Sequence, residues 1–163
     1  MPRDRPILST LLIIIMALYS IMGLASGALV LADTSGASLG LPEDVMDSLP
    51  VDDLLLVGLW LFVVWGVVPA ILCYGLLRRP KWGWTERLNG WTGMHWSWSG
   101  TAGLLLLLYI WLAVETYYIG FDAPIQYMTL IIGLIMTFLS LAPGVRRFYS
   151  EGPGKLSPIK GNT

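Results

Sequence analysis

Residues 54–77 read LLLVGLWLFVVWGVVPAILCYGLL, a run of 24 residues with no charged side chain, and Arg78, Arg79 and Lys81 follow at once. A helix needs about 20 consecutive apolar residues to cross the hydrocarbon core of a bilayer. Basic residues are enriched on the cytoplasmic side of such helices. The stretch therefore predicts a membrane-spanning helix that ends at the cytoplasmic face.

Stretches of the same character occur three more times in the 163-residue chain. We predict spans at about residues 7–31, 97–119 and 124–141. The first of these exceeds the apolar core of about 7 to 15 residues that a signal peptide carries, so we interpret it as a span. The predicted fold class is an all-α membrane protein, a four-transmembrane-helix antiparallel bundle with an interfacial Trp-rich segment between helices 2 and 3.

The distribution of basic residues sets the expected orientation. All ten Lys and Arg residues fall in residues 3–5, 78–87 and 146–160, whereas residues 32–53 hold six acidic residues and no basic one. This asymmetry predicts a multi-pass membrane protein with both termini in the cytoplasm. We expect residues 1–147 to form one domain and residues 148–163, with three glycines and two prolines, to form a flexible cytoplasmic tail.

The composition restricts the chemistry. Hydrophobic residues make up 55% of the chain and charged residues 13%, and the only cysteine and histidine are Cys73 and His95. A thiol oxidoreductase needs a cysteine pair, and a closed zinc site needs about four nitrogen or sulfur ligands. We therefore expect no enzyme, no cofactor and no metal. Membrane lipids are the expected partners of the basic segments, and nucleic acid is not.

Small residues and a proline mark places of close packing. Gly23 and Gly27 form a small-xxx-small pair, which lets another helix backbone approach closely, either within the monomer or in a dimer. Pro69 should kink the second span, as a packed kink or as a hinge. In the acidic loop, Pro42 suits the start of a short surface helix. The acids of that loop form a solvated face or a weak cation site.

Residues 80–100 contain five of the eight tryptophans of the chain. Tryptophan prefers the headgroup layer of a bilayer, so this segment is expected to lie along the inner leaflet as a lipid-facing belt. An aromatic cage for a ligand is the alternative. The predicted interfacial anchors are Trp82, Trp84, Trp91, Trp96, Trp98 and His95.

Glu115 is the only acidic or basic residue inside a predicted span. An ionisable group at that depth is costly and should have a partner. Folding the third and fourth spans about the turn at Gly120 should bring Gln126 and Tyr127 to the depth of Glu115. Two interpretations stay open: a structural clasp between these spans, or a ligand-binding or proton-exchanging acid near Trp111.

The second half of the chain resembles a family of small four-span bacterial integral membrane proteins that have no assigned activity. The residues that carry the resemblance are the run Trp111-Leu-Ala-Val-Glu115, Ile119-Gly120, Pro124-Ile-Gln126 and the ending Leu141-Ala-Pro-Gly-Val-Arg146-Arg147. The resemblance implies a bacterial plasma membrane and directs attention to Glu115 and Gln126.

Two hypotheses of function follow from the sequence. The first is a non-enzymatic accessory or assembly subunit of a membrane complex, or a self-associating bundle. The second is a small transporter or a ligand-binding or lipid-binding protein that uses Glu115 in an outward-facing pocket. That pocket would be lined by Trp111, Tyr117, Tyr118, Gln126 and Tyr127. Whether Glu115 faces a cavity or a neighbouring helix separates them.

Overall fold

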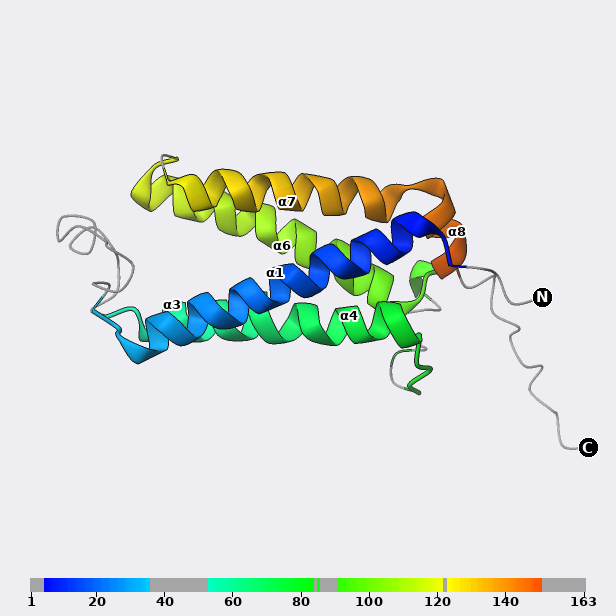
Figure 1. Cartoon of the computed structure of the whole chain (residues 1–163), viewed down its shortest axis with the longest axis horizontal. Coiled ribbons are helices and arrows are strands. Elements are labelled where there is room, and N and C mark those ends of the chain that lie inside the picture. The colour runs from blue at the N-terminus through cyan, green and yellow to red at the C-terminus, as the bar shows by residue number, and fades with distance from the viewer. Residues whose placement is uncertain (1–4, 36–52, 84, 86–90, 122, 151–163) are drawn as a thin grey trace, which may run out of the picture.

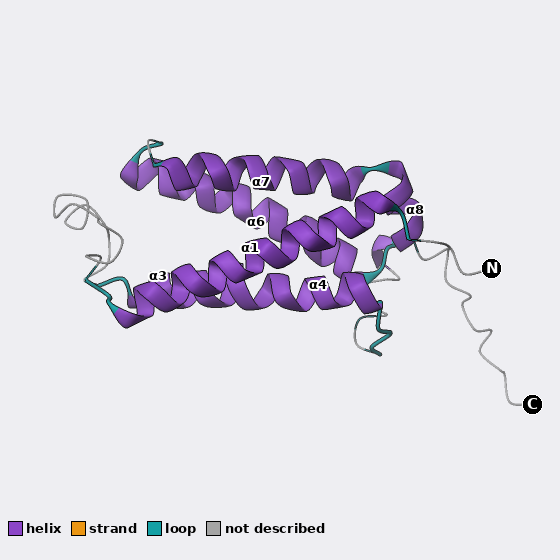
Figure 2. Ribbon diagram, viewed as in Figure 1, coloured by secondary structure: helices purple, strands orange, loops and turns teal. Residues whose placement is uncertain are grey.

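The computed structural model describes residues 5–35, 53–83, 85, 91–121 and 123–150. In this part of the chain every regular element is a helix (Figure 2). The elements are α1 (Ile7–Ala32), α3 (Leu55–Trp60), the π-helical η2 (Leu61–Val67), α4 (Val68–Arg78), α6 (Trp96–Ile119), α7 (Pro124–Leu141) and α8 (Pro143–Tyr149). The expected surface helix in the acidic loop and part of the Trp-rich segment, including Trp84, lie outside the described residues.

Four helices in the described residues are long and apolar enough to cross a membrane, as a multi-pass membrane protein requires. The second of them is the continuous helix Leu55–Arg78, here called the second span, which comprises α3, η2 and α4. The prediction of an all-helical chain with four long apolar helices is confirmed. Length and apolarity are local properties of sequence, so the observed bounds differ from the predicted ones by only about a residue.

The start of α1, the end of α4, the start of α6 and α8 lie together at one end of the molecule, called here the Tyr149 end (Figure 1). The turn between α6 and α7 lies at the opposite end, called here the Gly120 end. A core of buried apolar side chains from all four long helices connects the two ends.

The closest helix contact joins α1 to the second span. A Cβ atom at Gly23 would overlap the carbonyl oxygen of Trp65, and one at Gly27 would overlap the backbone of Phe62. In lipid the hydrophobic effect does not drive helices together, so helices associate through such close van der Waals contact. Both members of the small-xxx-small pair thus face the second span of the same chain.

The second span is irregular where it meets this glycine face. Residues 61–67 form a π-helix, in which the N–H of Val68 bonds the carbonyl of Val63. Pro69 follows directly and lacks an N–H, so regular α-helical bonding cannot be complete there. The Ser20 hydroxyl donates a 2.7 Å hydrogen bond to the carbonyl of Gly66. A side chain of α1 therefore stabilises the irregular turn.

The short helix α8 is held in place by Tyr149, which is fully buried. Its hydroxyl donates to the carbonyl of Leu76 at 2.8 Å and lies 2.9 Å from the Ser9 hydroxyl. Since the phenol has one proton, Ser9 is the donor in the second bond. Burial raises the pKa of Tyr149, against an opposing effect of the Ser9 hydrogen bond. The hydroxyl therefore remains a donor at neutral pH.

The prediction that the flexible tail begins at residue 148 is wrong for Phe148 and Tyr149. Both are buried side chains of α8, and the Arg79 guanidinium lies 4.8 Å from the centre of the Phe148 ring. The glycines and prolines that suggested a tail come after these residues, whereas two aromatic rings can bury enough apolar area to order a short helix. Residues 151–163 lie outside the described residues.

The glycine face of α1 can be tested with Gly23→Val. The new side chain must displace the backbone at Trp65, so we expect a loss of about 1 to 3 kcal/mol in unfolding free energy. Gly103→Ala is the matched control, because a Cβ at Gly103 meets nothing within 4 Å. Thermal unfolding in detergent measures both. Equal melting temperatures for the two variants would contradict the described contact.

The anchoring of α8 can be tested with Tyr149→Phe. The ring is kept while two buried hydrogen bonds are lost, so we expect unfolding free energy to fall by about 1 to 3 kcal/mol. Tyr74→Phe is the control, since Tyr74 is half exposed. Limited proteolysis should cut the Tyr149→Phe protein near α8 faster than the wild type. Unchanged cleavage and stability would show that the hydroxyl has no such role.

Candidate functional site

Glu115 lies in the last turns of α6, four residues before the helix ends at Ile119. Its side chain is partly buried. Trp111 is one helical turn earlier on the same face of α6. The indole of Trp111 stacks on that of Trp60 in α3, with ring centres 5.8 Å apart and planes inclined by 29°. The face of α6 that carries Glu115 therefore meets the second span.

Tyr19 of α1 lies within electrostatic range of the Glu115 carboxyl group, and its side chain is 7% exposed. Tyr19 in turn meets the Trp65 ring edge to face, with centroids 6.2 Å apart. Tyr19 and Trp65 thus form an aromatic contact between α1 and the second span.

The expected partner Gln126 serves a different purpose. Its amide nitrogen donates to the carbonyl of Gly120 at 3.0 Å, and its amide oxygen accepts from the N–H of Ala123 at 3.2 Å. Both bonds close the turn between α6 and α7. The clasp hypothesis is therefore wrong about Gln126, because nearby backbone groups of the turn satisfy the amide first.

The tyrosines of the expected outward pocket have exposed side chains. The Tyr127 hydroxyl donates to the carbonyl of Phe121, and the Tyr127 side chain is 46% exposed. Tyr117 and Tyr118 pack edge to face, and Tyr117 is 82% exposed. Of the residues predicted for the site, Trp111 and Glu115 share a face, while Gln126 and Tyr127 stabilise the turn.

Two buried indole nitrogens of the second span lack hydrogen bonds. Within the described residues, the buried indole nitrogens of Trp60 and Trp65 have no acceptor. A buried donor without an acceptor costs about 1 to 3 kcal/mol. Natural structures keep such donors rarely, and often at functional positions. The two indole nitrogens are thus unsatisfied donors within the second span.

An apolar groove of about 290 Å³ runs next to the stacked indoles. It is lined by Trp60, Leu107, Ile110, Trp111 and Val114. These residues come from α3 and α6, so the groove lies between the second span and the third long helix. Its walls suit an acyl chain or apolar side chains of another helix.

The Trp-rich segment differs in part from the predicted lipid-facing belt. His95 is 1% exposed and Trp96 is 6% exposed, so the prediction is wrong for these two anchors. The His95 Nδ1 lies 2.8 Å from the Ser97 hydroxyl at the start of α6. Trp96 stacks on Trp82 with centroids 5.0 Å apart, and its indole donates to the carbonyl of Pro80. Local capping and stacking bury these groups.

The remaining predicted anchors fall into two groups. The Trp98 indole donates to the carbonyl of Ser140 at 2.9 Å, so it joins α6 to α7. Trp91 is 87% exposed, as an anchor facing lipid or water would be. The described residues contain no group of three or more His, Cys, Asp or Glu that could hold a metal ion.

Searches of protein-family models, curated proteins and solved structures find no match for this chain. Its function must therefore be argued from its own residues.

Sequence reasoning did not identify Tyr19, Trp60 and Trp65. A signal was present for Tyr19, because it lies four residues before Gly23 and therefore one helical turn away on the same face of α1. The indoles carried no such signal, because eight tryptophans in an apolar chain cannot be told apart by position alone.

The partner assignments can be tested by comparing Glu115→Leu with Gln126→Leu. No hydrogen-bond partner of Glu115 occurs among the described residues, so Glu115→Leu should melt at or above the wild-type temperature. Gln126→Leu leaves the turn carbonyl and N–H unpaired and should lose about 1 to 3 kcal/mol. Thermal unfolding in detergent measures both. A Glu115→Leu variant that melts as low as Gln126→Leu would restore a structural role for the acid.

Proposed function

We propose that this chain is a non-enzymatic integral membrane protein of a bacterial plasma membrane that acts as an accessory or assembly subunit of a membrane complex. Its four long helices would form an antiparallel bundle with both termini in the cytoplasm. The observation that carries the proposal is the open apolar groove between α3 and α6, whose lining includes the stacked indoles of Trp60 and Trp111.

The charge distribution supports the orientation. The described basic residues, Arg5, Arg78, Arg79, Lys81, Arg146 and Arg147, belong to the elements of the Tyr149 end. The described acidic residues, Asp33, Asp53 and Glu115, belong to the segments nearer the Gly120 end. Basic residues are retained in the cytoplasm, so the Tyr149 end would be the cytoplasmic one.

The helix surfaces support association through the groove. The glycines of α1 that could have formed a dimer contact already face Trp65 and Phe62 of the same chain. The groove, in contrast, presents the aromatic faces of Trp60 and Trp111 beside Ile110, which is 52% exposed. A partner helix with apolar side chains could fill the groove through close van der Waals contact.

A second candidate function is favoured by the surroundings of Glu115. The acid lies within electrostatic range of Tyr19, and no hydrogen bond from a described residue reaches its carboxyl group. Such a group suits binding of a cationic or protonated ligand, or proton exchange during transport. In that case the groove would lead a ligand to Glu115 rather than hold a partner helix.

The test is gentle purification from the native membrane followed by mass spectrometry of the intact complex. We expect a partner subunit in fixed stoichiometry with the wild type. Ile110→Trp should fill the groove and weaken binding of the partner subunit about tenfold or more. Ile131→Trp is the control, because Ile131 is 56% exposed on α7 and does not line the groove.

Three outcomes separate the candidates. Loss of the partner in Ile110→Trp alone supports the accessory role. A monomer that carries a small molecule, released by Glu115→Gln but not by Ile131→Trp, favours the ligand-binding role instead. Equal retention of the partner by both tryptophan variants would contradict docking in the groove.

A further inference from the structure

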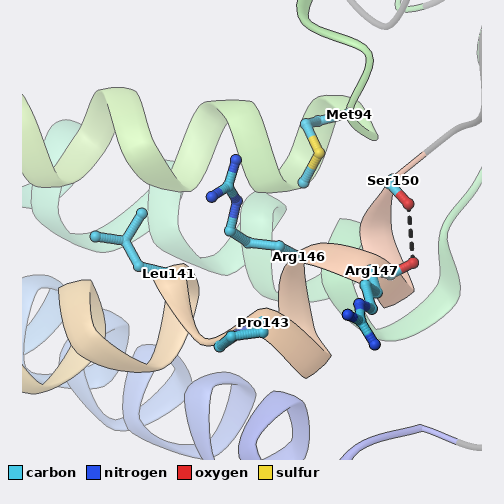
Figure 3. Close-up of a pocket in the computed structure, with 6 residues that line it drawn as sticks. All are labelled: Met94, Leu141, Pro143, Arg146, Arg147 and Ser150. Carbon is cyan, nitrogen blue, oxygen red and sulfur yellow. Dashed lines mark hydrogen bonds between the residues drawn. The ribbon is translucent and has the colours of Figure 1, made fainter.

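A second hollow, of about 300 Å³, lies at the Tyr149 end, on the opposite end of the molecule from Glu115. It is lined by Met94, Leu141, Pro143, Arg146, Arg147 and Ser150. Figure 3 shows the Arg146 side chain extending from α8 toward α6, between Leu141 and Met94, while Arg147 points away from that gap. We propose that this hollow binds the phosphate of an anionic membrane phospholipid through Arg146.

The hollow has an apolar side and a charged side, which match the acyl chains and the phosphate of a phospholipid. Leu141 is the last residue of α7 and is 53% exposed, and Phe138 one turn earlier is 72% exposed. These side chains form an apolar surface along which acyl chains can lie. The exposed guanidinium of Arg146 stands directly beyond them, where the span ends and the headgroup layer begins.

Within the described residues, Arg146 has no ion-pair partner, and the three acidic residues belong to segments nearer the Gly120 end. Two other arginines there are already engaged: Arg5 donates to the carbonyl of Leu77, and Arg79 lies over Phe148. Arg146 is thus the cation best placed to meet a lipid phosphate, with the planar fork of donors that phosphate oxygens accept.

The site is held in place before any lipid arrives. Val145 and Tyr149, which flank the arginine pair, are fully buried. The N–H of His95 donates to the carbonyl of Tyr149 at 2.9 Å, and Met94 pairs with Ser150 in an isolated β-bridge. The backbone that carries Arg146 is therefore fixed against the segment before α6. Binding then requires ordering of little more than one side chain, which favours affinity.

The proposal depends on insertion of the chain in a membrane but not on its role as an accessory subunit. The experiment titrates the intact protein, in detergent, with phosphatidylglycerol or with phosphatidylcholine of the same acyl chains, and counts bound lipid by native mass spectrometry. Arg146→Gln is compared with Arg78→Gln. Arg78 is an equally exposed arginine at the same end, in the last turn of α4, and does not line the hollow.

We expect the wild type to prefer phosphatidylglycerol, and Arg146→Gln to lower that affinity about fivefold, with Arg78→Gln close to the wild type. Phosphatidylcholine binding should change in neither variant. Melting temperatures without added lipid should match, since both arginines are exposed.

The proposal fails if the two glutamine variants bind phosphatidylglycerol equally, or if the wild type does not distinguish the two lipids. The final experiment adds inorganic phosphate to the protein with bound phosphatidylglycerol. If it displaces the lipid at millimolar concentration, the site recognises free phosphate and the assignment to a phospholipid is overturned. If it does not, the acyl chains are part of what the hollow recognises.

Discussion

The hydroxyl of Tyr149 connects three parts of the chain that are far apart in sequence. It accepts from Ser9 in α1, donates to Leu76 in α4, and belongs to α8, whose last carbonyl accepts from His95 ahead of α6. These bonds fix the relative positions of the helices at one end of the molecule. In a chain whose helices meet largely through apolar side chains, a few directional bonds select one arrangement among many with similar packing.

The second constraint is backbone satisfaction without water. Close approach at Gly23 and Gly27 places α1 within reach of the irregular π-helical turn, and Ser20 supplies the donor that Gly66 needs. Packing and hydrogen bonding therefore support one another along this helix pair. Among the described residues, buried side-chain nitrogens without hydrogen bonds remain at the Trp60 and Trp65 indoles of the second span and at the Nε atoms of Arg5 and Arg79 at the Tyr149 end. The open apolar groove beside Trp60 is the main physical argument that the region between α3 and α6 acts on something else.

The two ends of the molecule consequently differ in character. The Tyr149 end is closed by buried aromatic rings and rimmed with arginines, so it is suited to a fixed position against a charged lipid surface. The region between α3 and α6 carries an open apolar groove with polar groups beside it. One end would hold the protein in the bilayer and the other would meet a partner or a ligand, and each role can be lost without the other.

The sequence by itself determined the four long apolar helices, their bounds and the segregation of charge, because length, apolarity and charge are properties of consecutive residues. It also singled out Glu115 as the ionisable residue inside a span. Only the tertiary structure decided its surroundings: Gln126 bonds backbone groups of its own turn, and Tyr19, 96 positions away in sequence, lies within electrostatic range of Glu115. The same holds for Tyr149 and Trp96, which composition assigned to a tail and a lipid-facing belt. Which side chains become neighbours depends on the rotation of each apolar helix about its own axis. A helix face of nearly uniform hydrophobicity carries little information about that rotation.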